Sequence, residues 1–422
     1  MKRLICYPVD VTEDEKSVID DYWLLSDESS SGFLYTLQQI DRKHKSKQVR
    51  PVSILARKSS FYISHPAFIC QDCKCEIPVK NRRDYINRFK VKRAAVCSDC
   101  SDLRQQNLIA NAQNILREYV FDKFQPEQYL DGLSIEESLA LLSITAEQTE
   151  NSKYLGESID DVSITDIQSI DYKIVHSLIN KKALIHIPKL PSDVERANKV
   201  IYGDFSHVTY DKRYRKSVRY RHPDSIMPGI YLNNPTKNEC FEVSDITSIL
   251  YKRIQTSILT IDDFKMVNFL VKEMQIEKLY KLVSEVSKDK KIPIANSSVL
   301  RALLNHLAEC YPPQNIFFTF MVKAREAIEY IYKESIPVYK AKNYFAIFVG
   351  RYVQHQENKG NQLYKAWTLP PHIQTSPFEA LFSQIYLNGH FNWNNLSAKE
   401  VVALWLESVS LSESAKELLT EP

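Results

Sequence analysis

Residues 68–101 read FICQDCKCEIPVKNRRDYINRFKVKRAAVCSDCS, and this stretch carries two CxxC motifs, Cys70 with Cys73 and Cys97 with Cys100. A CxxC motif can form a tight knuckle in which both thiolates point at one ion, and two knuckles complete a closed tetrahedron. The spacing therefore predicts a structural Zn²⁺ site held by these four cysteines, with no open position for catalysis.

Two neighbouring residues leave the ligand set partly open. Cys75 extends the first motif to CxxCxC and can replace Cys73, and His65 is close enough in sequence to substitute for a cysteine. The CxxC geometry favours Cys73, with Cys75 packed beside the site. A redox CxxC is the other alternative, but it is expected once, at the start of a helix in a βαβ unit, so we expect structural zinc.

The paired motifs resemble a zinc ribbon or treble clef over about residues 61–105. The resemblance implies a small metal-held module, and it extends to no other part of the chain.

Glycine is rare, with 8 residues in 422, against an average usage of about 7 per cent. The chain has no GxGxxG, GxxxxGK[ST], GxSxG or HExxH motif, so nucleotide-binding doubly wound folds and the common hydrolase sites are disfavoured. Asp263-x-Lys265 leaves a metal-dependent nuclease as an alternative, although Thr260 with Asp263 also fits a helix cap. His306 and Cys310 are predicted to lie in a helix core. We expect a binding protein rather than an enzyme.

The periodicity of the chain predicts a mainly α, multidomain protein. Ser134 with Glu137, and Ser397 with Glu400, are capping-box patterns that begin helices. The predicted parts are a small α/β or β-rich unit over 1–60, the zinc ribbon over 61–105, a helical part over 106–190, an irregular, β-containing basic segment over 191–260, and a helical domain over 261–422.

Residues 167–187 predict a helix, a basic turn at 180–182 and a strand. This order is similar to the last helix and wing of a winged-helix domain. Residues 106–190 are predicted to be helical, and a winged-helix-like arrangement is one of the alternatives, because a helix followed by a strand is also common in other folds.

Two basic stretches predict binding to nucleic acid, with DNA favoured over RNA. Cations pair with phosphates, and neighbouring aromatic residues, such as Tyr85 and Phe89 in the first stretch, can stack on bases. The alternative is a solvated face or a site for acidic protein. The candidate residues are Lys80, Arg82, Arg83, Arg88, Lys90, Lys92 and Arg93 between the knuckles, and Lys212, Arg213, Arg215, Lys216, Arg219 and Arg221 further on.

The net charge of the whole chain is only +3, so local patches must carry any such binding. No signal peptide and no membrane span is expected, and the predicted location is cytoplasmic. We expect a zinc-stabilised nucleic-acid-binding accessory protein of bacterial mobile-element, phage-defence or regulatory machinery. The alternative is a scaffold subunit that docks a protein partner through its C-terminal helical domain.

Overall fold

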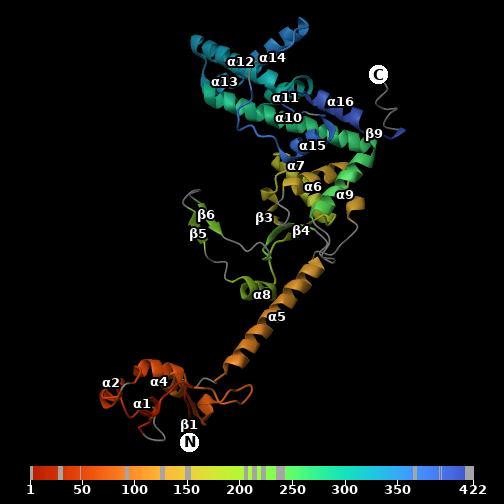
Figure 1. Ribbon diagram of the computed structural model, residues 1–422. Coiled ribbons are helices and arrows are strands. Elements are labelled where there is room, and N and C mark those ends of the chain that lie inside the picture. Colours follow the sequence, from red (N-terminus) through yellow and green to blue (C-terminus); the bar gives the residue numbers. More distant parts are fainter. Residues whose placement is uncertain are drawn as a thin grey trace. The chain divides into compact units, whose positions relative to one another are not determined.

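The computed structural model is mainly helical, as the sequence predicts, and it divides into two compact units, Met1–Asn114 and Ile115–Pro422 (Figure 1). None of the described helices is long and apolar enough to cross a membrane. The structure describes residues 3–26, 32–47, 49–90, 95–123, 129–147, 154–203, 208–211, 216–219, 225–233, 243–364, 368–388, 390 and 392–413.

The first unit packs helices around one antiparallel strand pair, β1 with β2, in which Arg3 pairs with Ile63. Its core is aromatic and includes Trp23, Phe61, Phe68 and Tyr85. Its elements are β1 (Arg3–Cys6), α1 (Glu13–Trp23), α2 (Leu37–Lys43), α3 (Val52–Lys58), β2 (Ser60–Ile63), the 3₁₀ turn η1 (Pro66–Phe68), α4 (Arg82–Lys90) and α5 (Ser98–Lys123), which ends in the second unit.

Two short apolar runs of this unit, of a length that also fits strands, are helical wholly or in part. The run that starts at Tyr22 belongs to the end of α1, because a reciprocal capping box between Thr12 and Glu15 begins a helix that reaches Trp23. The run after Pro51 forms α3. Runs of this length fit a strand or a buried helix equally well, so periodicity could not separate them.

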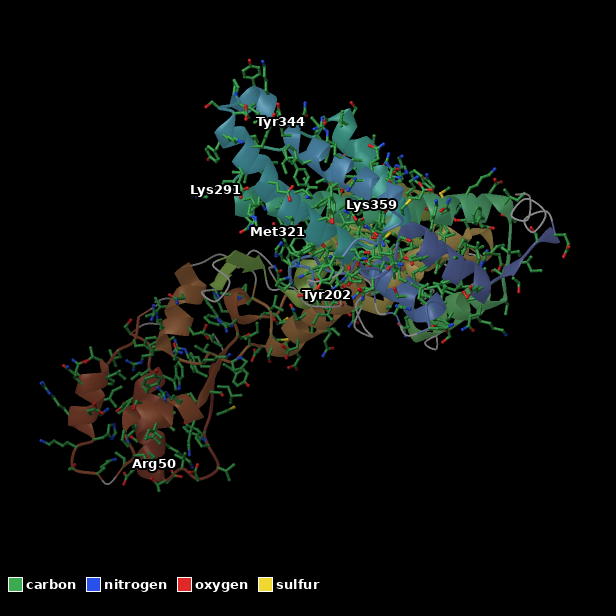
Figure 2. The ribbon with its side chains drawn as sticks, turned by 90° about the horizontal axis from the view of Figure 1, so that it is seen from above. Arg50, Tyr202, Lys291, Met321, Tyr344 and Lys359 are labelled. Carbon is green, nitrogen blue, oxygen red and sulfur yellow. The ribbon has the colours of Figure 1, made fainter. Side chains whose placement is uncertain are left out.

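Several residues of the basic stretch 42–50 contact acids of α1. Asp21 accepts from Lys43 Nζ at 2.9 Å and lies 2.7 Å from Nε2 of the buried His44. Arg50, labelled in Figure 2, donates through Nε to the buried Glu15 at 2.7 Å. These cations hold α1 and are engaged within the protein.

The second unit begins with helices around a three-stranded antiparallel sheet in the order β3-β7-β4. Its elements to residue 259 are the 3₁₀ turn η2 (Leu130–Gly132), α6 (Ile135–Glu147), β3 (Tyr154–Gly156), the 3₁₀ turn η3 (Ile159–Asp161), α7 (Gln168–Asn180), β4 (Leu184–Ile187), α8 (Ser192–Tyr202), β5 (Val208–Asp211), β6 (Lys216–Arg219), β7 (Gly229–Leu232), α9 (Val243–Thr256) and β8 (Ile258–Leu259).

The central strand of this sheet depends on a glycine. Gly229 has φ +148°, and a Cβ at this position would lie 2.4 Å from the carbonyl oxygen of Gly156 on β3. Only a residue without a side chain permits this approach. The pair therefore closes β3 against β7.

The C-terminal part is built on α10, the longest helix in the described chain, which lies alongside α11 and α12 (Figure 1). The remaining elements are α10 (Ile261–Lys290), α11 (Ser298–Cys310), α12 (Pro313–Lys333), α13 (Val338–Ala341), α14 (Tyr344–Asn358), α15 (Pro377–Tyr386), α16 (Ala398–Ser408) and β9 (Ser410–Leu411).

Two apolar cores fill the second unit. One joins α6, α7, β4, β7 and α9 to the first half of α10 and to α15 and α16; the other lies between the second half of α10 and α11, α12 and α14. A buried ion pair, Lys278 with Glu379 at 2.7 Å, connects α10 to α15. The segment 191–260, expected to be irregular, contains strands but also the helices α8 and α9, which the sequence patterns missed.

Candidate functional site

The first cysteine pair lies on a hairpin turn. Ile69 bridges Glu76, and the amide of Cys70 donates to the carbonyl of Cys75 at 2.8 Å. Lys74 adopts a left-handed conformation, φ 61°, and its amide donates to the carbonyl of Cys70 at 3.1 Å. The turn therefore closes on itself immediately after Cys73, which is the knuckle that the CxxC spacing predicts.

The second pair lies at the start of α5, with Cys100 in its first turn. The amide of Cys97 donates to Sγ of Cys70 at 3.3 Å, and the amide of Cys100 donates to Sγ of Cys97 at 3.4 Å. Amide donors aimed at sulfur stabilise thiolates, which are the forms that bind metal. The helix start thus brings the second pair to the first.

The sulfur atoms of Cys70, Cys73, Cys75 and Cys97 lie within 4.8 Å of one another and could hold a metal ion. Cys100 lies within the same distance of Cys70 and of a carboxylate oxygen of Asp72. The centre therefore gathers all five cysteines of the segment, with Cys75 beside Cys73 and Cys97 and with Cys100 beside Cys70. Asp72, the second residue inside the first CxxC, had no sequence signal of its own.

The thiols of this centre differ in acidity. Backbone amides, that of Cys73 first, lower the pKa of Cys70 to about 6. The hydrogen bond with Cys73 raises the pKa of Cys75 to about 12. Cys70 is thus favoured as a thiolate, whereas Cys75 retains its proton beside Cys73.

The apolar support of the centre is small. Its buried residues are Cys70, Ile77 and Cys97, and outside them Arg104 of α5 pairs with Asp72 at 2.6 Å. His65 does not belong to any of the possible metal-ligand groups among the described residues, and its Nδ1 instead accepts from the amide of Ala67. The alternative of His65 as a ligand thus finds no support.

Two arginines proposed to contact nucleic acid are engaged inside the first unit. Arg82 donates to the carbonyls of Tyr22 and Tyr35, and its guanidinium lies over the Tyr22 ring at 4.4 Å. Arg88 pairs with Asp84 at 2.9 Å. Backbone carbonyls engage Arg82 and Asp84 engages Arg88, so these two candidates already have partners within the first unit.

Tyr85 is also unsuited to stacking on a base. Its ring is 1 % exposed and stacks on Phe68 at 5.4 Å. Lys80 and Arg83, in contrast, are exposed.

The other basic candidates fall largely outside the described residues. Lys216 and Arg219 lie on β6, which pairs with β5, but their side chains are not described. The remaining candidates outside the description are the side chain of Lys90 and residues Lys92, Arg93, Lys212, Arg213, Arg215 and Arg221.

Helix α7 presents a polar face to solvent. Ser169, Tyr172, Lys173, His176 and Asn180 are exposed, at the spacing of one helical face. On the opposite face, Ile174, Val175 and Leu178 enter the core.

The loop before α7 is fixed by a buried acid. Asp171 accepts from the amides of Ile164 and Thr165 at 3.1 and 2.8 Å, and burial raises its pKa. The start of α7 therefore has one defined position.

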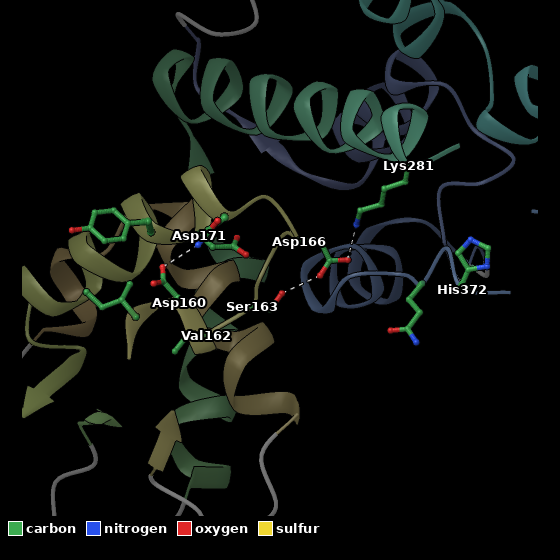
Figure 3. Close-up of a pocket in the computed structure, with 11 residues that line it drawn as sticks. Asp160, Val162, Ser163, Asp166, Asp171, Lys281 and His372 are labelled. Atoms are coloured by element: carbon green, nitrogen blue, oxygen red, sulfur yellow. Dashed lines mark hydrogen bonds and ion pairs between the residues drawn. The ribbon is translucent and has the colours of Figure 1, made fainter. Parts of the chain in front are cut away.

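A cavity of about 460 Å³ lies beside this loop, between α7, α10 and the segment around His372 (Figure 3). Its acids are already engaged: Asp160 accepts from Gln168 at 3.3 Å, and Asp166 pairs with Lys281 at 3.3 Å. These two carboxylates of the lining therefore already have partners within the protein, and His372, also in the lining, pairs with Glu285 at 3.2 Å.

Two further candidate reactive sites of the sequence are Asp263 and the pair of Cys310 with His306. Asp263 accepts from the amide and the hydroxyl of Thr260 and so caps α10. This is the helix cap that the sequence offered as the alternative to a nuclease site. Cys310 and His306, expected in a core, are exposed, with Sγ 3.9 Å from Nδ1. Partial burial raises the pKa of Cys310, so it remains a thiol rather than an activated nucleophile.

No protein-family model matches the chain, and neither a curated protein nor a solved structure matches it.

Proposed function

We propose that this chain is a zinc-containing, duplex-DNA-binding protein in which α7 enters the major groove. The observation that carries the proposal is the order α6, β3, α7, β4, β7 together with the sheet order β3-β7-β4. In a winged-helix domain, a helix and a first strand precede the recognition helix, and two further strands follow it, with the last strand central. The arrangement of residues 135–232 supports that assignment.

The exposed face of α7 has suitable chemistry for reading bases. Asn180 and His176 offer hydrogen-bond donors and acceptors, Ser169 and Tyr172 offer hydroxyls, and Lys173 offers a cation. Asparagine and lysine are among the side chains that recognise adenine and guanine edges in the major groove. The deep, narrow major groove of A-form RNA does not admit such a helix, which favours DNA.

The lysines on and near α7 differ in how available they are to bind phosphate. Lys181 is held by Glu137 at 2.6 Å, so the exposed Lys173 is the better phosphate partner. The basic residues near 212–221 lie within the long connection from β4 to β7, where a wing would be. They would extend the positively charged surface along the duplex.

The proposed module departs from a usual winged helix in two places. Between β3 and α7 the only element is the single turn η3, where a second helix is common, and α8 with the β5–β6 hairpin enlarges the wing. Neither change alters the exposed face of α7. The recognition role of that face is therefore retained in the proposal.

Zinc is the ion that best fits the cysteine centre. An all-sulfur donor set that can close a tetrahedron is typical of structural zinc. One pair on a hairpin knuckle and the other at a helix start supports a treble clef in preference to a ribbon, in which both pairs lie on hairpins. Its role in the proposal is structural.

The test replaces the exposed face of α7 by Lys173→Gln, His176→Ala and Asn180→Ala together. Binding of the full chain to a duplex of mixed sequence is measured by fluorescence anisotropy over a series of salt concentrations. We expect affinity to fall at least tenfold and the slope of log affinity against log salt to flatten by about 0.9 for each phosphate that the variant no longer neutralises.

A matched control makes the same three types of exchange at exposed positions of the C-terminal helical part: Lys359→Gln, His372→Ala and Asn361→Ala. Lys359 is labelled in Figure 2. The control should bind as the parent does. Equal affinity and equal slope for the α7 variant and the parent would remove α7 from the interface. Absence of binding by the parent would refute the proposed function itself.

A second variant tests the enlarged wing, with Arg213, Arg215, Arg219 and Arg221 all replaced by glutamine. We expect a flatter salt slope at an unchanged melting temperature, because phosphate contacts act through counterion release. An unchanged slope would exclude this segment from the contact surface.

A further inference from the structure

The cysteine centre contains one more thiol than a tetrahedral ion requires. Cys70, Cys73, Cys75, Cys97 and Cys100 all lie at the same centre, whereas a structural zinc ion takes four ligands. One thiol is therefore in excess, and its identity decides what chemistry the centre can carry out.

Burial separates the thiols into two kinds. Cys70 is 0 % exposed and Cys97 is 7 % exposed, whereas Cys73 and Cys75 are both exposed. A small oxidant in solution therefore reaches Cys73 and Cys75 most readily.

The two exposed thiols also lie close to each other. Sγ of Cys73 lies 3.2 Å from Sγ of Cys75, compared with 3.7 Å between Cys73 and Cys97. The left-handed turn at Lys74, which lies between them, brings the two side chains together. This separation lets one sulfur reach the other without opening the knuckle.

We propose that Cys73 is the oxidation site of this centre and that Cys75 is its resolving thiol, so that peroxide converts the pair into a disulfide and releases the ion reversibly. The proposal rests on zinc as the proposed ion, but the thiol chemistry can be measured without it.

The reaction balances with hydrogen peroxide as the only oxidant. The Cys73 sulfur attacks one peroxide oxygen, so an S–O bond forms, the O–O bond breaks and hydroxide leaves. The Cys75 sulfur then attacks the Cys73 sulfur, so that the S–S bond forms and the S–O bond breaks. The departing hydroxide takes the Cys75 proton and leaves as water. The two sulfurs lose two electrons, and the peroxide is reduced.

The disulfide removes Cys73 from the ligand set and leaves Cys70, Cys97 and Cys100. The buried cluster at the centre consists of Ile77 and two cysteines, Cys70 and Cys97. With so little apolar packing, the three remaining thiolates must hold both the ion and the hairpin. Loss of a ligand should therefore loosen the ion and the knuckle together.

The experiment treats the purified, zinc-loaded full chain with hydrogen peroxide and follows zinc release with a chromogenic chelator. Peptide mass spectrometry then identifies the product at Cys73 and Cys75. In the parent we expect a Cys73–Cys75 disulfide, with zinc rebinding to at least nine-tenths of the starting amount after dithiothreitol.

The informative variant is Cys75→Ser, with Cys310→Ser as the control for an exposed cysteine outside the centre. Without a resolving thiol, Cys73 should proceed to sulfinic acid, and less than half of the zinc should rebind after reduction. The control should behave as the parent does.

Three results would overturn the proposal. They are a disulfide between other cysteines, full zinc recovery in Cys75→Ser, and loss of zinc from Cys75→Ser before any peroxide is added, which would make Cys75 a permanent ligand. If the parent is purified without zinc but still forms the Cys73–Cys75 disulfide, the proposed ion is wrong and the thiol pairing stands.

Discussion

The cysteine segment of the first unit and the helices around α10 are held together in different ways. The former has a buried cluster of Cys70, Ile77 and Cys97, whereas the core around α11 buries residues from α10, α11, α12 and α14, Leu304 among them. Small modules that cannot bury enough apolar surface depend on a bound metal, while helical packing derives its stability from burial itself. Metal removal should therefore unfold the cysteine segment, whereas substitutions that reduce burial should destabilise the helices around α10.

The largest expected effect is on the cysteine segment. Removal of the ion with a chelator, or Cys97→Ser, should abolish the ordered structure of the knuckle, because the energy of metal binding to thiolates is folding energy in such a site. Hydrogen exchange at residues 70–76 and 97–101, which carry the cysteines, should rise to the rate of an unfolded peptide, while exchange in α10–α12 stays as slow as before.

The control is Cys310→Ser, which leaves the centre intact. Slow exchange at residues 70–76 and 97–101 after complete metal removal would show that the comparison is mistaken and that packing suffices there.

The next effect concerns the ion pair that connects α10 to α15. Lys278 and Glu379 have side chains only 8 % and 3 % exposed, and the amide of Trp393 also donates to Glu379 at 2.7 Å. Glu379→Gln leaves the ammonium group of Lys278 without a counter-charge, so the free energy of unfolding should fall by about 3–5 kcal/mol. Urea denaturation of the full chain, followed by circular dichroism, measures this loss.

Glu309→Gln is the matched control, because its pair with Lys272 is 37 % exposed on both sides. Its cost should be at most about 1 kcal/mol. Equal losses for the two variants would mean that burial does not distinguish the two pairs.

Leu304→Ala tests apolar packing alone. Leu304 is 0 % exposed, and removing its side chain should cost about 2–5 kcal/mol through reduced burial and the cavity left behind. Val299→Ala on the same helix, where the side chain is 54 % exposed, should change stability by less than about 0.5 kcal/mol. Zinc content should be the same in both variants, and a loss of zinc in Leu304→Ala would link the two regions.

The smallest effect is a pH dependence within α6. Burial, with a smaller effect of Glu137, raises the pKa of Glu136 from 4.5 to about 7. A raised pKa means that the folded state favours the protonated carboxyl, so this stability is complete below pH 4.5 and is lost as pH rises through 7. Glu136→Gln should match the parent at pH 4 and exceed it by about 1–3 kcal/mol at pH 8.

Thermal melts at the two pH values, carried out on full-length protein, measure this difference. A variant that melts below the parent at pH 8 would show that Glu136 is stabilised as a carboxylate by a group that outweighs its burial.

The signals that could be read from the chain are local ones. Three of the four CxxC cysteines, Cys70, Cys73 and Cys97, lie in one cluster with Cys75, and the fourth, Cys100, lies beside Cys70. The caps at Thr260 and Ser397 begin α10 and α16. These features depend on residues within a few positions of one another, so spacing and side-chain type suffice to predict them. The predicted helix and strand over 167–187 correspond to α7 and β4 for the same reason.

Only the tertiary structure decided which charges are available and which strands pair. Arg82 looks like a surface cation in sequence, but carbonyls 47 to 61 positions away engage it. β7 lies between β3 and β4 although it follows them in the chain. Contacts between distant residues are set by which apolar faces pack together, and no local pattern specifies those partners.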